Sequence, residues 1–281
     1  MQKKLFVIGL GPGDAQHMTP AALAAIESST IVTGYQVYLD LIAELTPGKE
    51  TFSTGMRQET ERCREALRRA DLGAVVSLVC SGDAGIYGMA GLVLELQQLE
   101  GPVEVEVEIV PGISAVQGAA ARLGAPLMHD FAVISLSDLL TDWGLIKRRL
   151  DAAGRADFVV ALYNPKSRGR TTQIGEARDI LLRHRSPETP VGIVRNACRE
   201  GESSCVTTLA EMLEAEIDMF SVVIIGNSST GVDNQGRMVT PRGYAKKREA
   251  KETPLPEGEG LGEGGICAQA THHPASGHLL P

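Results

Sequence analysis

The sequence predicts an α/β fold in two halves, and three observations lead to this prediction. Short apolar runs typical of buried strands recur along the first 243 residues, and most of them precede segments with helical spacing of apolar residues. Several of these runs end in glycine-rich turns, as strands do at the ligand-binding edge of an open α/β sheet. After residue 244 the apolar periodicity stops and glycine and proline become frequent. We therefore expect α/β domains at 1–120 and 125–243, a ligand cleft between them, and a disordered tail at 245–281.

The composition narrows the class of protein. A net charge of −8 argues against a general nucleic-acid binder. No apolar run approaches the ~20 residues of a membrane span, and the apolar run near the N-terminus is too short for a signal peptide. The five cysteines form neither a CxxC pair nor part of a His/Cys quartet, so we expect free thiols and no metal site. Together these features predict a cytoplasmic protein.

The first half opens with a predicted strand over 4–8 that runs into the turn GLGPGD at 9–14. This turn differs from a dinucleotide-binding loop, because its third glycine comes one residue early and Pro12 removes a backbone donor. Thr19-Pro20 predicts the start of a helix over 21–28, since threonine is a good N-cap and proline suits the first helical position. The next expected elements are a strand over 30–33, a helix over 34–45, a loop over 52–57 and a charged helix with ion pairs over 59–69.

The strongest functional signal is the stretch SGDAGIYGM at 81–89. It follows an apolar run over 74–80 that is typical of a strand buried on both faces, and helical spacing is predicted from 86 to 99. Its glycines allow a sharp turn and the close approach of a ligand. Asp83 lies close to the predicted helix start, so a turn with an N-cap is the simple interpretation and a ligand contact is the functional one.

A second turn of this kind follows a predicted strand over 103–110, in which apolar residues alternate with glutamates. The turn is VPGISA at 110–115, where Ser114 suits either an N-cap or a ligand contact. Glycine turns at the ends of several strands are therefore expected to meet at one edge of the sheet.

The second half repeats the pattern. Strands are expected at 132–135, 157–163, 189–195, 206–209 (antiparallel) and 221–225, and helices at 143–152, 172–184 and 211–215. A basic loop, KSRGR at 166–170, follows the second of these strands.

Six motifs in a fixed order resemble those of the tetrapyrrole methylases. They are GLGPGD (9–14), SGDAGIYG (81–88), VPGISA (110–115), LYNP (162–165), VRNA (194–197) and IIGNSS (224–229). Longer stretches, among them GYQVYLDLI (34–42), TGMRQETERCREAL (54–67) and LYNPKSRGR (162–170), look most like the branch that methylates C17 of precorrin-3B in cobalamin biosynthesis. The resemblance covers about 1–243.

This resemblance implies two αβα domains with S-adenosyl-L-methionine bound in the cleft between them. It also implies a homodimer and a tetrapyrrole substrate, either precorrin-3B or its cobalt-containing counterpart. The positions that match cofactor contacts in the family are Gly11, Pro12, Gly13, Ser81, Gly82, Asp83, Ile86, Ser114, Ala115, Tyr163 and Ala197. The sequence departs from some relatives at Ala84, where they carry proline, and at Ala197 and Cys198, where small glycines are often found. Two alternatives stay open: another methylase of this fold, acting on C11 of precorrin-4 or on uroporphyrinogen III, and a noncatalytic nucleotide-binding protein.

With precorrin-3B as substrate, the implied reaction needs a general base, because ring contraction requires deprotonation of its C20 hydroxyl. Asp83 and Tyr87 are the candidates, with Asp138 and His129 as further choices by position or type. A substrate with many carboxylates also requires local positive charge in an acidic protein. The cations that lie in loops or at strand ends, and that we expect to bind substrate, are Arg57, Lys166, Arg168, Arg170 and Arg195.

Overall fold

The structure, a computed structural model, describes residues 3–13, 15–55, 58–100 and 104–244. Arg57 and the predicted tail at 245–281 lie outside the described residues. The chain divides into two units, Met1–Arg242 and Gly243–Pro281, and all elements given below belong to the first unit.

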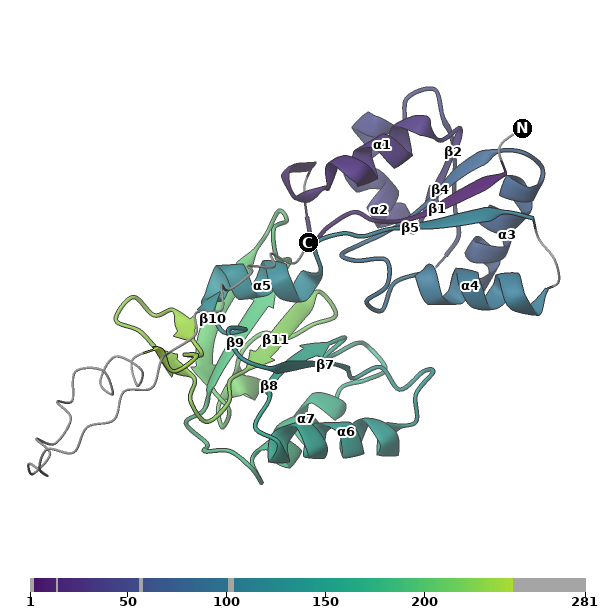
Figure 1. The fold of residues 1–281 in the computed structure, drawn as a ribbon. Coiled ribbons are helices and arrows are strands. Elements are labelled where there is room, and N and C mark those ends of the chain that lie inside the picture. Colours follow the sequence, from purple (N-terminus) through teal and green to yellow (C-terminus); the bar gives the residue numbers. More distant parts are fainter. Residues whose placement is uncertain (1–2, 14, 56–57, 101–103, 245–281) are drawn as a thin grey trace, which may run out of the picture. The chain divides into compact units, whose positions relative to one another are not determined.

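The first sheet contains five parallel strands in the order β3-β2-β4-β1-β5 (Figure 1). They are β1 (Lys4–Gly9), β2 (Ile31–Gly34), β3 (Glu50–Ser53), β4 (Val75–Cys80) and β5 (Glu106–Val110). The central strands β1 and β4 are buried along nearly their whole length, as their apolar runs predict. The predicted loop over 52–57 is wrong at its start, because β3 includes Phe52 and Ser53.

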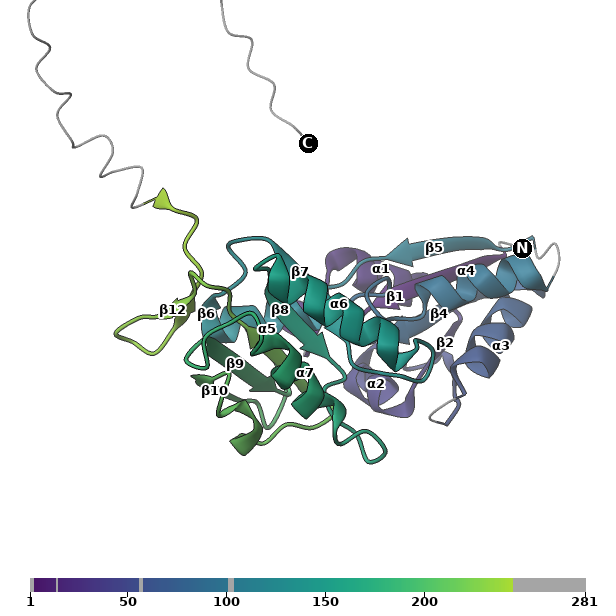
Figure 2. The same cartoon turned by 90° about the horizontal axis from the view of Figure 1, so that it is seen from below.

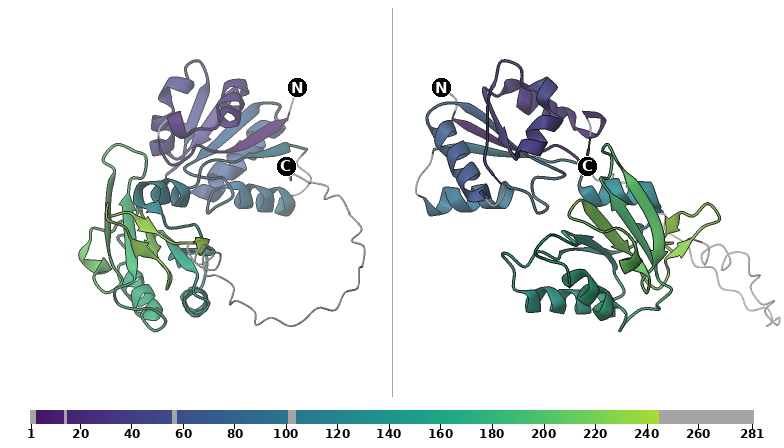
Figure 3. Two further views of the ribbon diagram at one scale, coloured as in Figure 1. Left: turned by 60° about the vertical axis from the view of Figure 1, so that its left-hand side comes forward. Right: turned by 180° about the vertical axis from the view of Figure 1, so that it is seen from behind.

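Helices cover both faces of this sheet. Alternate residues of β1 point to opposite faces, so Leu5 and Val7 pack with α3 (Glu59–Asp71) and α4 (Ala90–Leu99), whereas Phe6 and Ile8 pack with α1 (Pro20–Ser28) and α2 (Gln36–Leu41). Figure 3 shows the same layering from two further sides, with purple and blue helices flanking the strands. Thr19 caps α1 as predicted, since its Oγ1 accepts a hydrogen bond from Ala22 N at 3.1 Å. Short 3-10 helices lie at Ala15–His17 (η1) and Ala43–Leu45 (η2).

In the first half, two predicted helices differ from the structure. The helix expected from residue 86 begins only at Ala90, because the carboxylate of Asp83 folds the chain into a turn and Tyr87 has a left-handed backbone, with φ of 55°. The helix expected over 34–45 is divided into α2 and η2 at Ile42, which has non-helical backbone angles.

The second sheet is mixed and has the order β10-β9-β11-β8-β7 (Figure 1). Figure 2 shows β7, β8, β9 and β10 from below. Its strands are β7 (Phe131–Ser135), β8 (Val159–Tyr163), β9 (Pro190–Arg195), β10 (Ser203–Thr208) and β11 (Ser221–Ile225). Of the neighbouring pairs in this sheet, β7 with β8 is parallel and the others are antiparallel; the pairing of β10 with β9 confirms the direction predicted for 206–209.

Helices α6 (Trp143–Arg155) and α7 (Gln173–Leu181) pack on one face of the second sheet, and α5 (Ala115–Leu123) packs on the other. Helix α5 therefore belongs with the second sheet, although it begins before residue 120. The domain limits 1–120 and 125–243 stay a prediction. The remaining elements are η3 (Met212–Glu214) and a small sheet of β6 (Gly124–Ala125), β12 (Gly231–Val232) and β13 (Met238–Val239).

Two general features complete the fold. The described cysteines, Cys63, Cys80, Cys198 and Cys205, are all free thiols, as expected. Within the described ranges, no helix is long and apolar enough to cross a membrane.

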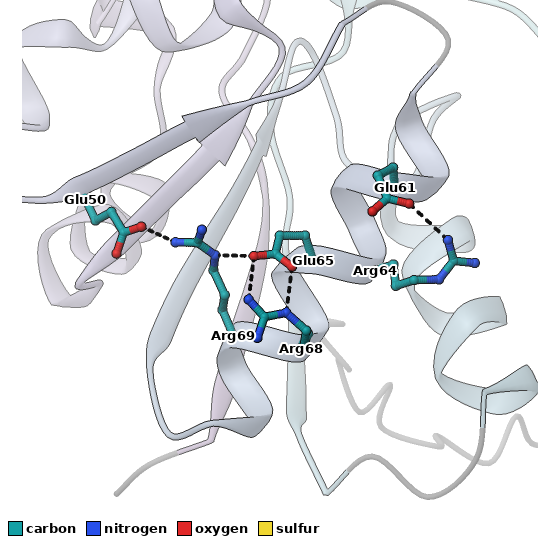
Figure 4. A network of polar contacts seen from close by, with 6 residues as sticks. All are labelled: Glu50, Glu61, Arg64, Glu65, Arg68 and Arg69. Carbon is teal, nitrogen blue, oxygen red and sulfur yellow. Dashed lines mark hydrogen bonds and ion pairs between the residues drawn. The ribbon is translucent and has the colours of Figure 1, made fainter.

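The exposed face of α3 carries the expected network of ion pairs (Figure 4). The Glu65 carboxylate accepts hydrogen bonds from Arg68 Nε at 2.7 Å and from Arg69 Nε at 2.6 Å, and Arg69 also pairs with Glu50 of β3. These hydrogen bonds, first from Arg68 and then from Arg69, lower the pKa of Glu65 from 4.5 to about 2. The network thus joins α3 to the edge strand β3.

We expect Glu65→Gln to lower the free energy of unfolding by about 1 kcal/mol at pH 7, because the arginines it pairs with are partly exposed. A carboxylate whose pKa is lowered by folding stabilises the protein above its unfolded pKa, and this stabilisation is lost as the pH falls through the folded pKa. The difference between variant and wild type should therefore shrink between pH 4.5 and about 2. Urea unfolding at several pH values measures it. Glu61→Gln is the control, since Glu61 is 65% exposed and, within the described part of the chain, its ion-pair partner is Arg64. An equal loss in both variants, or a pH-independent loss, would contradict this account.

Candidate functional site

Three glycine turns meet where the neighbouring strands β4, β1 and β5 end. Gly11 and Gly82 exchange two backbone hydrogen bonds, Gly11 N to Gly82 O at 3.0 Å and Gly82 N to Gly11 O at 2.8 Å. A Cβ on Gly112 would lie 2.2 Å from Gly82 O and 2.5 Å from Gly9 O. The turns are therefore in direct backbone contact, which only glycine permits here. The meeting of turns expected from the sequence is present.

Asp83 joins two of these turns. Its Oδ1 accepts hydrogen bonds from Gly85 N at 2.8 Å and Ile86 N at 3.1 Å, and its Oδ2 accepts one from Gly112 N at 3.0 Å. The N-cap interpretation for Asp83 is wrong, because α4 starts at Ala90 with Met89 as its N-cap residue. Both carboxylate oxygens instead hold the backbone of the turns in place.

A pocket opens beside the glycine turns and is lined by residues of the turns that follow β1 and β4, of neighbouring helices and of the second sheet and its loops. The lining residues are Pro12, Tyr38, Ser81, Gly82, Asp83, Ile86, Tyr87, Ala115, Tyr163, Asn164, Asn196, Ala197, Arg199, Met219, Phe220, Ser221 and Val222. Most of the residues expected to contact a cofactor are in this set. Segments far apart in sequence thus build one site.

Gly11, Gly13 and Ser114 were also expected at the cofactor but do not line the pocket. Gly11 is paired with Gly82, and a Cβ on Gly13 would lie 1.6 Å from Cys198 O, so both glycines allow close packing behind the wall. Ser114 is the N-cap residue of α5, and its backbone N–H donates to Gln117 Oε1 at 3.0 Å. These residues support the pocket wall.

Several lining residues have left-handed backbones. Among the described non-glycine residues with positive φ are Tyr87 (55°), Asn164 (48°) and Asn196 (50°), all in the pocket, and Cys198 (59°) beside it. Such conformations concentrate at functional sites, where the surrounding structure holds them. The two asparagines lie in LYNP and VRNA, so the motifs marked them, but they were not among the site residues expected from the sequence.

Tyr87 and Tyr163 form an aromatic wall, with ring centroids 5.4 Å apart. The Tyr163 hydroxyl accepts a hydrogen bond from Val116 N at 2.8 Å, and burial raises the pKa of Tyr163. The Tyr87 hydroxyl donates to Val133 O at 3.1 Å and accepts from Ser135 N at 3.0 Å. Tyr87 therefore ties the 81–89 loop to the edge strand β7.

The further candidates for a base lie elsewhere. Asp138 accepts a hydrogen bond from Gln173 Nε2 at 2.9 Å, and the side chain of His129 is half exposed beside Asp130. Neither lines the pocket.

The described cations expected to bind substrate also lie outside the pocket lining. Ser167 and Arg170 exchange backbone hydrogen bonds, so Arg168 sits exposed at the tip of a tight turn near Lys166. The Arg170 side chain is buried and donates from Nε to Asn164 O at 3.2 Å. Arg195 pairs with Asp218 at 2.6 Å.

Arg199 is the cation that does line the pocket, and the sequence analysis missed it. Its Nε donates to Pro12 O at 2.6 Å and its Nη2 donates to Ser81 Oγ. Desolvation lowers the pKa of Arg199, and burial raises the pKa of the neighbouring Tyr38. A charged residue two positions after VRNA was the available signal, but in the sequence it looks like any surface charge.

Comparison with known proteins places the chain in a family. Residues 4–213 match the model for "Tetrapyrrole (Corrin/Porphyrin) Methylases". The chain is 50% identical over 240 residues to a probable cobalt-factor III C(17)-methyltransferase of Salmonella typhimurium, which covers 85% of this chain and 99% of the relative. It is 42% identical over 252 residues to a precorrin-3B C(17)-methyltransferase of Sinorhizobium sp., covering 87% and 98%.

A further relative is longer. The chain is 49% identical over 259 residues to the cobalt-factor III methyltransferase of Priestia megaterium, a match that covers 91% of this chain but spans about half (48%) of that protein. Among solved structures, the methyltransferase CobJ is similar with a TM-score of 0.78 and 35% identity, over 84% of this chain and 99% of that one. A uroporphyrin-III C-methyl transferase from Thermus thermophilus complexed with S-adenosyl homocysteine is similar with a TM-score of 0.61 and 27% identity, over 79% and 97%. The chain belongs to the tetrapyrrole methylases.

Proposed function

We propose that this protein transfers a methyl group from S-adenosyl-L-methionine to C17 of cobalt-factor III or precorrin-3B, with ring contraction, in cobalamin biosynthesis. The observation that carries the proposal is the pocket in which the glycine turns of the first sheet meet the strand ends of the second. Ligands of open α/β sheets bind at this edge. The reaction is inferred from the relatives, because those named for the C17 reaction are 42–50% identical to this chain along most of its length.

The cofactor is proposed to lie along the lining that Pro12, the 81–86 turn, Ala115, Tyr163 and Ala197 provide. One of the similar structures is a complex with S-adenosyl homocysteine, which supports a cofactor of this class. The backbone groups of glycine turns suit a nucleoside, because a ligand can approach them closely. A homodimer in the cytoplasm completes the proposal.

The proposed chemistry needs alignment more than reactive side chains. The cofactor supplies an electrophilic methyl group on a sulfonium. The pocket then has to hold the nucleophilic carbon of the macrocycle in line with that methyl group. The paired tyrosine rings and the exposed side chains of Met219 and Phe220 offer an apolar surface for the flat ring system. For precorrin-3B, the ring contraction also requires that the C20 hydroxyl give its proton to a base.

Asp83 and Tyr87, the candidates for this base, have backbone partners already. The Asp83 carboxylate accepts hydrogen bonds from three amide N–H groups. The Tyr87 hydroxyl makes its hydrogen bonds to the backbone of β7. The proposal therefore gives Asp83 a positioning role, and it gives Tyr87 the part of holding the loop against the second sheet.

The test is an incubation with ¹³C-methyl S-adenosylmethionine and either cobalt-factor III or precorrin-3B, followed by mass spectrometry and ¹³C NMR of the product. A new methyl group at C17 in a contracted ring is the expected result. A methyl group at another carbon would support a different methylase of this fold. No binding of S-adenosyl homocysteine in calorimetry would support a noncatalytic nucleotide-binding protein.

Substrate binding by the basic loop gives a separate prediction. If Arg168 contacts a substrate carboxylate, Arg168→Gln should raise the KM for the tetrapyrrole roughly 10-fold, through one lost charged hydrogen bond. The effect should diminish at high salt. Steady-state kinetics at two salt concentrations measures both, and Arg149→Gln on the exposed side of α6 is the matched control. An unchanged KM would make this loop an ordinary surface turn. Arg170 is less suited to the test, because its buried side chain supports Asn164.

A further inference from the structure

Among the described residues Arg199 has no acidic partner, unlike its neighbours Arg195 and Arg122. Arg195 pairs with Asp218, and Arg122 pairs with Glu202 at 2.9 Å. The two hydrogen bonds of Arg199 go to neutral oxygens, those of Pro12 and Ser81. Its other terminal nitrogen, Nη1, has no hydrogen-bond partner among the described residues. A partly buried cation of this kind is poorly compensated unless an anion joins it.

The backbone around Arg199 holds it firmly at the pocket. Asn196 and Cys198 have left-handed backbones, and Arg199 N donates to Asn196 O at 2.9 Å. Glu202 accepts a hydrogen bond from the Cys198 N–H, and Arg122 of α5 pairs with the same carboxylate. The turn is thereby fixed to α5, so the guanidinium is preorganised before any ligand arrives.

The charges of the lining favour an anionic group at this point. Of the lining residues, Arg199 is the one cation and Asp83 the one carboxylate, and three backbone N–H groups already occupy Asp83. A guanidinium with free N–H groups matches the geometry of a carboxylate.

We propose that Arg199 is the carboxylate receptor of this pocket. The inference rests on the proposed function, which supplies two sources of such a group: the amino-acid end of the S-adenosyl cofactor and the acid side chains of the tetrapyrrole. The competing role is structural, in which Arg199 only clasps the turn of Pro12 to that of Ser81.

The experiment uses calorimetry on wild type, Arg199→Gln and Arg199→Lys with two nucleosides. S-adenosyl homocysteine carries the amino-acid carboxylate, whereas 5′-methylthioadenosine lacks it. A third titration uses cobalt-factor III. Arg237→Gln is the control, because it removes the same charge from an exposed arginine in the loop between β12 and β13. Melting temperatures of all variants report on the clasp.

If Arg199 binds the carboxylate of the cofactor, Arg199→Gln should weaken the binding of S-adenosyl homocysteine roughly 10- to 100-fold and leave the binding of 5′-methylthioadenosine nearly unchanged. If Arg199 instead binds a carboxylate of the macrocycle, the same loss of affinity should appear for cobalt-factor III, and the affinity for both nucleosides should not change. Arg199→Lys should bind more tightly than Arg199→Gln, because lysine keeps the positive charge. It should not reach wild-type affinity, because an ammonium group lacks the planar fork of a guanidinium.

Equal weakening of both nucleosides, with a lower melting temperature, would show a clasp and overturn the inference. Unchanged affinity for all three ligands would overturn it as well. These results leave the proposed function standing if wild type still methylates its substrate. Wild-type protein that binds neither nucleoside would contradict the proposed function itself, and the inference with it.

Discussion

Gly112→Ala is expected to destabilise the protein severely and to abolish cofactor binding. The added Cβ would lie 2.2 Å from Gly82 O, 2.5 Å from Gly9 O and 2.7 Å from Gly9 C. All three are backbone atoms at strand ends, so no side-chain rotation can relieve the contact. Overpacking in a dense interior costs about 1–3 kcal/mol and occasionally more. We expect the upper end of this range, because Gly112 N also has to stay within reach of Asp83.

The measurement is urea unfolding together with calorimetric titration of S-adenosyl homocysteine. Gly91→Ala is the matched control, since a Cβ at this position of α4 meets nothing within 4 Å. That variant should be neutral or gain up to about 1 kcal/mol from the better helix propensity of alanine. Normal stability and affinity in Gly112→Ala would mean that the three turns are not packed backbone to backbone.

The fold was largely predictable because its central strands are buried on both faces. Runs such as Val75–Cys80 and Ser221–Ile225 have no polar side to obscure them. The edge strand β3 was missed because its four residues, Glu50–Ser53, are largely exposed and carry no apolar periodicity. The late start of α4 was missed for a different reason, since apolar spacing cannot show that a nearby carboxylate holds the chain in a turn.

The candidate site was predictable where glycine has to allow a close approach, as at Gly82. The cations of the site were not predictable, because the only guide to them in the sequence is the local density of charge. Arg199 contacts Pro12 across 187 positions of sequence, and no local pattern reveals such a contact. Lys166 and Arg168 form a dense basic cluster in the sequence, yet the turn at Ser167 leaves them outside the pocket lining.

Asp83→Asn tests whether this residue acts by position or as a base. An asparagine offers one acceptor oxygen, and its amide NH₂ group would face a backbone N–H at the other position. Whichever way it turns, it loses a charged hydrogen bond and leaves either Gly112 N or the amides of Gly85 and Ile86 without an acceptor. Hydrogen bonds to charged groups contribute about 1.5–3 kcal/mol each, so we expect a loss of roughly 2–4 kcal/mol in unfolding free energy.

Asp83→Asn should also weaken the binding of S-adenosyl homocysteine at least about 10-fold, because the turn that Asp83 holds supplies Ser81, Gly82 and Ile86 to the pocket. Asp142→Asn is the control, since the described contact of the Asp142 side chain is a single hydrogen bond accepted from Leu145 N at 3.1 Å, at the start of α6 and away from the pocket. It should lose less stability and keep its ligand affinity.

A general base behaves differently: its removal leaves folding and product-analogue binding intact and lowers turnover alone. Normal melting and normal affinity in Asp83→Asn, with turnover lost, would therefore return Asp83 to the role of base.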